Sequence, residues 1–174
     1  PPPPAPPRQN NNTNDDDDSQ LLELATHSDD PTPAVTRLVF SEADAQARAL
    51  VKRLMRDDAG LVIREDAVGN VYGVWPGTGG GGGEADGGQE LGMVLTGSHC
   101  DAIPLAGAYD GTLGVIGAVE ALAALRRAGF RPRRPLAVVM FTSEEPTRFG
   151  LSCSGSRAMA GALVFLGCPW RAIL

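Results

Sequence analysis

Two adjacent glutamates, Glu144 and Glu145, come shortly after the apolar run "LAVVMF", which is typical of a buried strand. A charged pair at a strand end is often no more than solvated surface. Neighbouring side chains leaving a strand point in different directions, however, so one carboxylate can bind a metal ion while the other takes a proton from water. The pair therefore suggests metal-assisted hydrolysis, with Glu145 as a ligand and Glu144 as the general base.

A second group of polar residues lies upstream, in "GSHCDAIPLAGAYDG". His99 ends the apolar run "MVLTGS", Asp101 follows two residues later, and Asp110 precedes a long apolar segment. One histidine and several carboxylates suit Mn²⁺ or Zn²⁺, and the absence of thiolates favours the harder ion. We predict that His99 binds metal through one ring nitrogen while Asp101 accepts a hydrogen bond from the other. Asp110, with two oxygens, can bridge two metal ions.

Each of these residues also has a structural interpretation. His99 could be a core histidine with satisfied ring nitrogens, and Asp110 could simply cap the following helix. Cys100 could be a further ligand, but it alternates away from His99 at the strand end, so we expect it to fill the core instead. Arg148 is expected to fasten its own loop rather than to bind an anionic substrate, and His27 to face solvent.

The elements that position these residues alternate between helix and strand. Ser41 with Asp44 three positions later resembles a capping box, and the apolar stripe that follows predicts a helix ending at Gly60. Segments 61–65 and 70–75 predict a β-hairpin.

The predicted site lies at the ends of two strands. "MVLTGS" and "LAVVMF" are interpreted as short buried strands, and the segment 112–128 between them as a helix. This helix is apolar on nearly every face, so we expect it to be sandwiched between other elements. A strand-helix-strand unit is typical of an α/β sheet, in which the carboxyl ends of neighbouring strands converge on one crevice. The histidine and the carboxylates are therefore expected to meet.

Composition limits the partners. A formal net charge of -6 and a pI near 4.8 disfavour a nucleic-acid or anionic-membrane surface and favour small molecules. The three cysteines have no metal-binding or disulfide spacing. No apolar run reaches the roughly 20 residues of a membrane span, and no leader segment is visible.

Two low-complexity stretches divide the chain. Residues 1–20 are rich in proline, asparagine and aspartate and predict a disordered tail. Residues 76–92 are rich in glycine, but they lack the GK[ST] ending of a phosphate-binding loop. We interpret this segment as a flexible surface insertion.

The motifs "SHCDAIP", "GAYDG" and "TSEEPTRFG" resemble the metal-binding segment of the amidohydrolase (hydantoinase/carbamoylase) branch of the M20 metallopeptidase family. With the upstream "GLVIREDAVGNVYGVWPG", they are most similar to the plant and algal ureidoglycolate amidohydrolases. The resemblance covers residues 21–161 and implies an α/β catalytic domain whose sheet is flanked by helices. It also implies two Mn²⁺ ions, with His99, Asp110 and Glu145 as ligands, Glu144 as the base and Asp101 behind His99.

Members of this branch hydrolyse a carbamoyl C–N bond. The resemblance thus implies conversion of ureidoglycolate to glyoxylate, ammonia and carbon dioxide in purine and allantoin catabolism, with allantoate or an N-carbamoyl-L-amino acid as the alternative substrate. It further implies a homodimer, located in the endoplasmic reticulum as in plant relatives or in the cytoplasm. A peptidase or aminoacylase of the wider family is a weaker alternative.

Family members are much longer than this chain. Their remaining metal-ligand histidines, their dimerisation (lid) domain and the C-terminal part of their catalytic domain come from later residues. Residues 162–174 do not resemble the family's continuation. We therefore expect an incomplete M20-type catalytic domain, as from a truncated or mis-spliced gene, that is inactive by itself. The alternative of another class is a binding module without catalysis.

Overall fold

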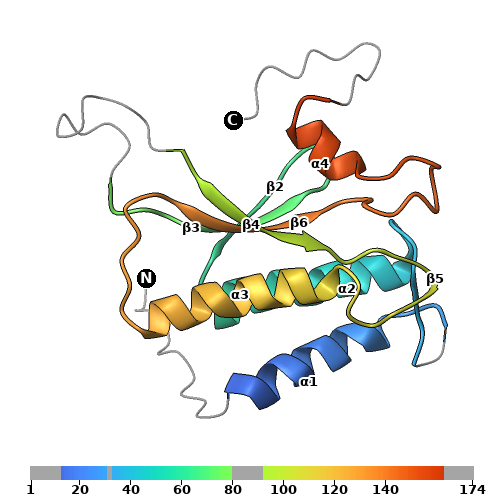
Figure 1. The fold of residues 1–174 in the computed structure, drawn as a ribbon, viewed down its shortest axis with the longest axis horizontal. Coiled ribbons are helices and arrows are strands. Elements are labelled where there is room, and N and C mark those ends of the chain that lie inside the picture. The colour runs from blue at the N-terminus through green and yellow to red at the C-terminus, as the bar shows by residue number, and fades with distance from the viewer. Residues whose placement is uncertain (1–12, 31–32, 80–91, 163–174) are drawn as a thin grey trace.

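The computed structural model describes residues 13–30, 33–79 and 92–162 (Figure 1). The elements, in chain order, are α1 (Thr13–Thr26), β1 (Val35–Arg37), α2 (Glu42–Arg53), the π-helical turn η1 (Leu54–Asp58), β2 (Val62–Glu65), β3 (Val71–Trp75), β4 (Val94–His99), β5 (Ala102–Ala106), α3 (Thr112–Arg127), β6 (Leu136–Phe141) and α4 (Ser154–Met159).

A four-stranded sheet with the order β2-β3-β6-β4 forms the centre of the fold. β4 and β6 run parallel and are connected through α3, whereas β2-β3 and β3-β6 are antiparallel pairs. A separate two-stranded sheet joins β1 to β5. The predicted α/β class, hairpin and strand-helix-strand unit are therefore confirmed.

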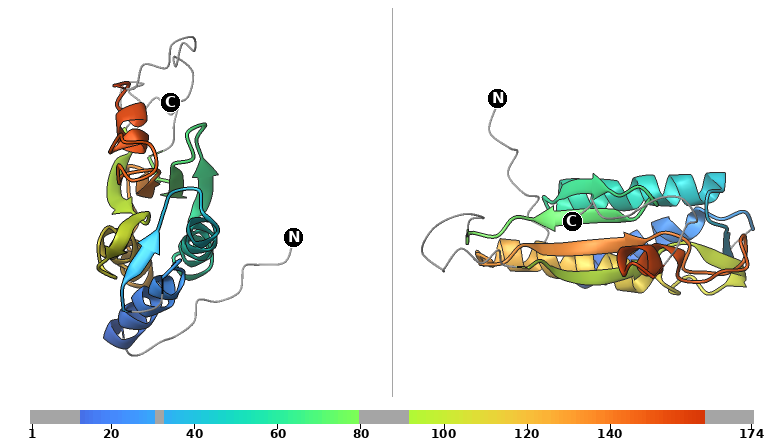
Figure 2. Two further views of the ribbon diagram at one scale, coloured as in Figure 1. Left: turned by 90° about the vertical axis from the view of Figure 1, so that its right-hand side faces the viewer. Right: turned by 90° about the horizontal axis from the view of Figure 1, so that it is seen from above.

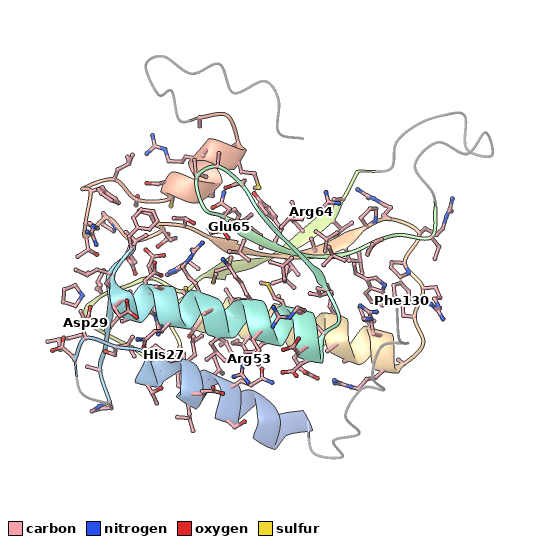
Figure 3. The ribbon with its side chains drawn as sticks, turned by 180° about the vertical axis from the view of Figure 1, so that it is seen from behind. His27, Asp29, Arg53, Arg64, Glu65 and Phe130 are labelled. Atoms are coloured by element: carbon pink, nitrogen blue, oxygen red, sulfur yellow. The ribbon has the colours of Figure 1, made fainter. Side chains whose placement is uncertain are left out.

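Three helices lie on one side of the sheet, with α2 and α3 next to it and α1 beyond them (Figures 1 and 2). The main core fills the space between the sheet and these helices, and it includes Leu24, Met55, Val115, Val138 and Met140. Seen from behind, Arg53 lies between α2 and α1 (Figure 3), where its guanidinium bonds to Glu23 at 2.8 Å.

The predicted start and end of the second helix are confirmed. Ser41 caps α2 by accepting a hydrogen bond from the main-chain N–H of Asp44. The helical stretch continues through η1, and Gly60 then adopts a left-handed conformation with φ of 63°. The sequence pattern did not predict the π-helical turn.

The predicted boundary of the disordered tail at residue 20 is wrong, because α1 begins at Thr13. Leu21, Leu24 and Ala25 are buried, and α1 packs against α3. Burial of this apolar face stabilises a helix that the polar composition before it did not suggest. Residues 1–12 lie outside the described residues.

The expected burial of β4 and α3 on all sides is also wrong. β4 is an edge strand among the described residues, and Val94 and Leu95 are 44% and 40% exposed. α3 is buried along Val115, Val119 and Leu122, but Leu113 is 55% exposed. The described elements cover one side of this helix, and its other side, although largely apolar, is exposed.

Other predictions fall wholly or partly outside the described residues. In the glycine-rich segment 76–92, the main-chain N–H groups of Thr78 and Gly79 bond to the carbonyls of Pro132 and Arg133, and residues 80–91 are not described. Residues 163–174, which make up nearly all of the predicted atypical tail, also lie outside the described residues. Within the described ranges, no helix is long and apolar enough to cross a membrane.

Candidate metal centre

The parallel pairing of β4 and β6 brings the candidate residues to one edge of the sheet. His99 is the last residue of β4 and lies opposite Phe141, the last residue of β6. Glu144 and Glu145 follow β6 closely, and Asp110 lies just before α3. Ligand atoms of His99, Asp110 and Glu145 all lie within 4.8 Å of one another. The topology thus gathers the residues that the sequence predicted to meet.

The hydrogen bond of His99 determines which ring nitrogen is available. Nδ1 lies 2.9 Å from the main-chain carbonyl of Asp101. Because a carbonyl only accepts hydrogen bonds, Nδ1 is the donor, and in the neutral imidazole Nε2 then keeps its lone pair for a metal ion. Nε2 faces Glu144 Oε2 at 3.6 Å and Asp110 Oδ1 at 3.9 Å. His99 is buried, but only one of its ring nitrogens is satisfied by the core.

Gly111 packs directly on the imidazole of His99. A Cβ at this position would stand 2.5–2.6 Å from three atoms of the ring. The backbone of Gly111 also has φ of 66°, a conformation that side-chain-bearing residues rarely adopt. The N-cap of α3 is Gly111, with no side-chain capping bond. Asp110 therefore does not cap the helix, and its half-exposed carboxylate faces the His99 ring instead.

Asp101 supports the site in a different way from the one predicted. Its main-chain carbonyl, rather than its carboxylate, is the acceptor for His99, and Oδ1 lies 3.7 Å from Nδ1. The carboxylate accepts the main-chain N–H groups of Glu144 and Glu145 at 3.2 and 3.0 Å. Burial raises the pKa of Asp101, while these two amides and His99 act in the opposite direction. Asp101 therefore ties the end of β4 to the loop after β6.

The two glutamates have different surroundings. Glu144 accepts a hydrogen bond from the Cys153 thiol through Oε1, at 3.3 Å, while Oε2 faces His99. Glu145 is half-buried, and its pKa is raised first by burial and then by the neighbouring charge of Glu144. Oxygens of both glutamates lie near the His99 ring, so which of them binds metal and which acts as the base stays a prediction.

The donor set fits a divalent cation. It consists of one imidazole nitrogen and two carboxylates, and the nearby Cys153 thiol is held protonated because its hydrogen bond to Glu144 raises its pKa. Nitrogen and oxygen donors of this kind suit Mn²⁺ or Zn²⁺. After burial, the neighbouring charges of Glu144 and Asp110 help to raise the pKa of Glu145, and a bound cation would act in the opposite direction.

The alternatives for two other residues are decided by their contacts. Cys100 is buried in the core, as expected, and burial raises the pKa of its thiol to about 12. Arg148 donates to the carbonyl of Val39 at 2.9 Å and so fastens its loop to the loop before α2.

The sequence reasoning overlooked Asn70. This residue is fully buried and bonds to the main chain of Thr142, two residues before Glu144. The sequence contains a usable signal, because Asn70 lies between a turn glycine, Gly69, and a buried strand. A buried asparagine needs hydrogen-bond partners for its amide, so this position predicts contacts with another segment.

Comparison with known proteins gives a consistent result. Residues 95–173 match the model of "Peptidase family M20/M25/M40". Ureidoglycolate hydrolase of Oryza sativa subsp. japonica is 56% identical over 143 residues, which is 82% of this chain and 28% of that protein. The ureidoglycolate hydrolase of Arabidopsis thaliana is 51% identical over 144 residues, 83% of this chain and 28% of that protein.

A crystal structure of AtUAH in complex with glyoxylate superimposes with a TM-score of 0.77 at 50% identity, covering 85% of this chain and 33% of that one. The chain thus spans about 28% of the length of the curated relatives that it matches.

Proposed function

The chain belongs to the M20 family, in its amidohydrolase branch, and on this premise we propose that it forms part of the catalytic domain of a longer ureidoglycolate-hydrolysing enzyme. The observation that carries the proposal is the meeting of His99, Asp110 and Glu145 beside Glu144. Identities of 51% and 56% to two ureidoglycolate hydrolases support the choice of substrate.

Each residue has a defined task in this proposal. His99 Nε2 and the carboxylates of Asp110 and Glu145 would hold the metal ions. A metal pair, when bound, would polarise the ureido carbonyl and lower the pKa of water. Gly111 and the Asp101 carbonyl orient the imidazole of His99, and the Asp101 carboxylate holds the main chain of both glutamates.

Glu144 moves the proton. Its Oε2 takes a proton from the attacking water, the water oxygen bonds to the ureido carbon, and the C–N bond breaks. The same carboxyl then returns the proton to the departing nitrogen, so that the reaction is balanced. The Cys153 thiol donates a hydrogen bond to Glu144 Oε1, and Oε2 faces His99 in the metal centre.

Three finer features are proposed from the family resemblance. The metal is Mn²⁺ rather than Zn²⁺, with two ions in the complete enzyme, in which further ligands come from residues beyond this chain. The longer protein is a homodimer, and it acts in the endoplasmic reticulum or the cytoplasm. The 174-residue chain alone is expected to show no turnover.

The test is turnover by the longer protein that contains this chain. The purified protein with Mn²⁺ is incubated with ureidoglycolate, allantoate and an N-carbamoyl-L-amino acid in parallel, and glyoxylate and ammonia are measured. Release of glyoxylate from ureidoglycolate at the highest kcat/KM is the expected result. Preferred turnover of either other substrate would refute the substrate choice, and turnover of none would favour a binding module.

A further inference from the structure

Asn70 lies directly after the turn of the β2-β3 hairpin and is completely buried, with 0% of its surface exposed. Its amide makes three hydrogen bonds. Nδ2 donates to Asp66 Oδ2 at 2.8 Å and to the carbonyl of Gly155 at 3.0 Å, while Oδ1 accepts from the main-chain N–H of Thr142 at 2.9 Å. Both donors and the oxygen are therefore used, as a buried amide requires.

Thr142 begins the metal loop, defined here as residues 142–145, and Gly155 belongs to the segment 153–155 that pairs with this loop. The main chain of this loop pairs with residues 153–155 by three hydrogen bonds. They run from Cys153 N to Glu144 O at 2.8 Å, from Ser154 N to Ser143 O at 2.9 Å and from Gly155 N to Thr142 O at 2.9 Å. The Asn70 amide bonds to the main-chain N–H of Thr142 and to the carbonyl of Gly155, as a peptide group of a neighbouring strand would.

The fit around the Asn70 amide is tight. A Cβ on Gly155 would overlap Asn70 Oδ1 and stand 2.7 Å from the main-chain N and O of Thr142. At its base, the asparagine is held by Asp66, which accepts its main-chain N–H at 2.9 Å in addition to the side-chain bond. Tyr72 donates its hydroxyl to the same carboxylate at 2.9 Å. Asn70 therefore has one defined position.

The direction of the two glutamates depends on where the metal loop starts. Between Thr142 and Glu144 the chain makes a left-handed step at Ser143, with φ of 54°. A small movement of Thr142 would therefore rotate the carboxylates that follow. Asp101 holds the far end of the loop through the amides of Glu144 and Glu145, and Asn70 holds the near end.

We propose that Asn70 is a positioning residue for the candidate metal centre, fixing the metal loop so that Glu145 reaches the metal and Glu144 faces the site. The catalytic part of this inference rests on the proposed function. The geometric part rests on this chain alone, since no substrate contact enters it.

Three variants of the longer protein test the proposal. Asn70→Ala removes all three hydrogen bonds. Asn70→Ser keeps a small hydroxyl, which can both donate and accept and sets no second carboxylate against Asp66. Tyr72→Phe is the matched control, because it loses a bond to Asp66 in the same hairpin and keeps the three hydrogen bonds of Asn70 to Asp66, Thr142 and Gly155.

Two readouts are measured, namely the dissociation constant for Mn²⁺ and deuterium uptake by peptides that cover residues 140–156. Asn70→Ala should weaken Mn²⁺ binding by about 10- to 100-fold, as loss of an outer support of metal ligands typically does. Deuterium uptake should rise in the metal loop, because Thr142 loses its acceptor. Asn70→Ser should lose less than Asn70→Ala in both readouts, and Tyr72→Phe should bind Mn²⁺ like the wild type.

Equal Mn²⁺ affinity in Asn70→Ala and Tyr72→Phe would overturn the proposal, whatever their melting temperatures. If Asn70→Ala does not fold, Asn70→Ser is compared with Tyr72→Phe instead, and equal affinity again overturns the proposal. A wild-type protein that binds Mn²⁺ but hydrolyses no ureide would refute the proposed function. Mn²⁺ affinity and deuterium uptake would still test the role of Asn70, because neither measurement needs turnover.

Discussion

Replacement of Gly111 by alanine should damage the metal centre while leaving the fold in place. The added Cβ would stand 2.5 Å from Cε1 of His99 and 2.6 Å from both ring nitrogens. Carbon contacts are comfortable at about 3.5–4.0 Å, so the imidazole must retreat by roughly 1 Å. Its Nε2 would then leave the position that faces Asp110 and Glu144.

Two effects should separate in this variant. The left-handed backbone of Gly111 adds a cost of about 1–2 kcal/mol for alanine, which lowers the melting temperature modestly. The shift of His99 should have a larger effect, because a misplacement of about 1 Å in an active site can cost about 10²-fold in rate. We expect Mn²⁺ affinity and ureide turnover to fall at least 10-fold each.

The assay compares Gly111→Ala with Gly117→Ala in the longer protein. Gly117 lies within α3, and nothing stands within 4 Å of an added Cβ there. Alanine at this helical position should stabilise the protein by about 0.5–1 kcal/mol and leave metal binding unchanged. Metal content is measured after dialysis against graded Mn²⁺. Equal metal binding by both variants would refute the argument that Gly111 sets the position of His99.

Three further predictions use other contacts. Asp101→Asn should weaken Mn²⁺ binding by about 10-fold and lower the melting temperature, since an amide cannot accept both N–H groups of the loop; unchanged metal affinity would contradict this role. Arg37→Met should lower the free energy of unfolding by about 3 kcal/mol in chemical denaturation, because the buried guanidinium donates hydrogen bonds to the carbonyls of Leu24, His27 and Cys100. Arg64 is exposed, so Arg64→Met should change the free energy of unfolding little. Cys100 should resist iodoacetamide at pH 8 in the native protein, because a pKa of about 12 leaves only about 10⁻⁴ of it as thiolate, and rapid labelling of this thiol would show that the core is open.

The gathering of the site was predictable because it depends on topology. Strand-helix-strand units place the carboxyl ends of parallel strands side by side, so the positions of His99, Asp110 and Glu145 in the sequence were enough to predict that they meet. The roles of the five candidate residues remain predictions.

The supports of the site were less accessible to sequence reasoning. The spacing of Asp101 from His99 suggested a bond between their side chains, but the strand end turns so that the main-chain carbonyl takes that place. The carboxylate is thereby free for Glu144 and Glu145, which lie more than forty positions along the chain. Asn70 is a similar case, because its partners Thr142 and Gly155 are brought near only by the folded sheet.

The two errors in the fold have a common cause. Composition alone assigned Thr13 and the residues after it to a disordered tail, and composition alone made α3 a helix covered on every side. In each case the outcome depends on which distant surface is available for burial. Leu24, on the inner side of α1, is buried against the rest of the core, while Leu113 in α3 remains exposed.

Metal analysis of the variants Glu144→Gln and Glu145→Gln, in the longer protein, tests the central claim most directly. Glu144→Gln keeps the shape of the side chain and removes the base, so Mn²⁺ content should stay near that of the wild type while turnover falls by roughly 10²-fold or more. Glu145→Gln weakens a ligand, so Mn²⁺ content should fall and excess Mn²⁺ should restore part of the activity. Loss of metal in Glu144→Gln with retention in Glu145→Gln would reverse the two roles, and full metal content and activity in both would contradict the metal centre itself.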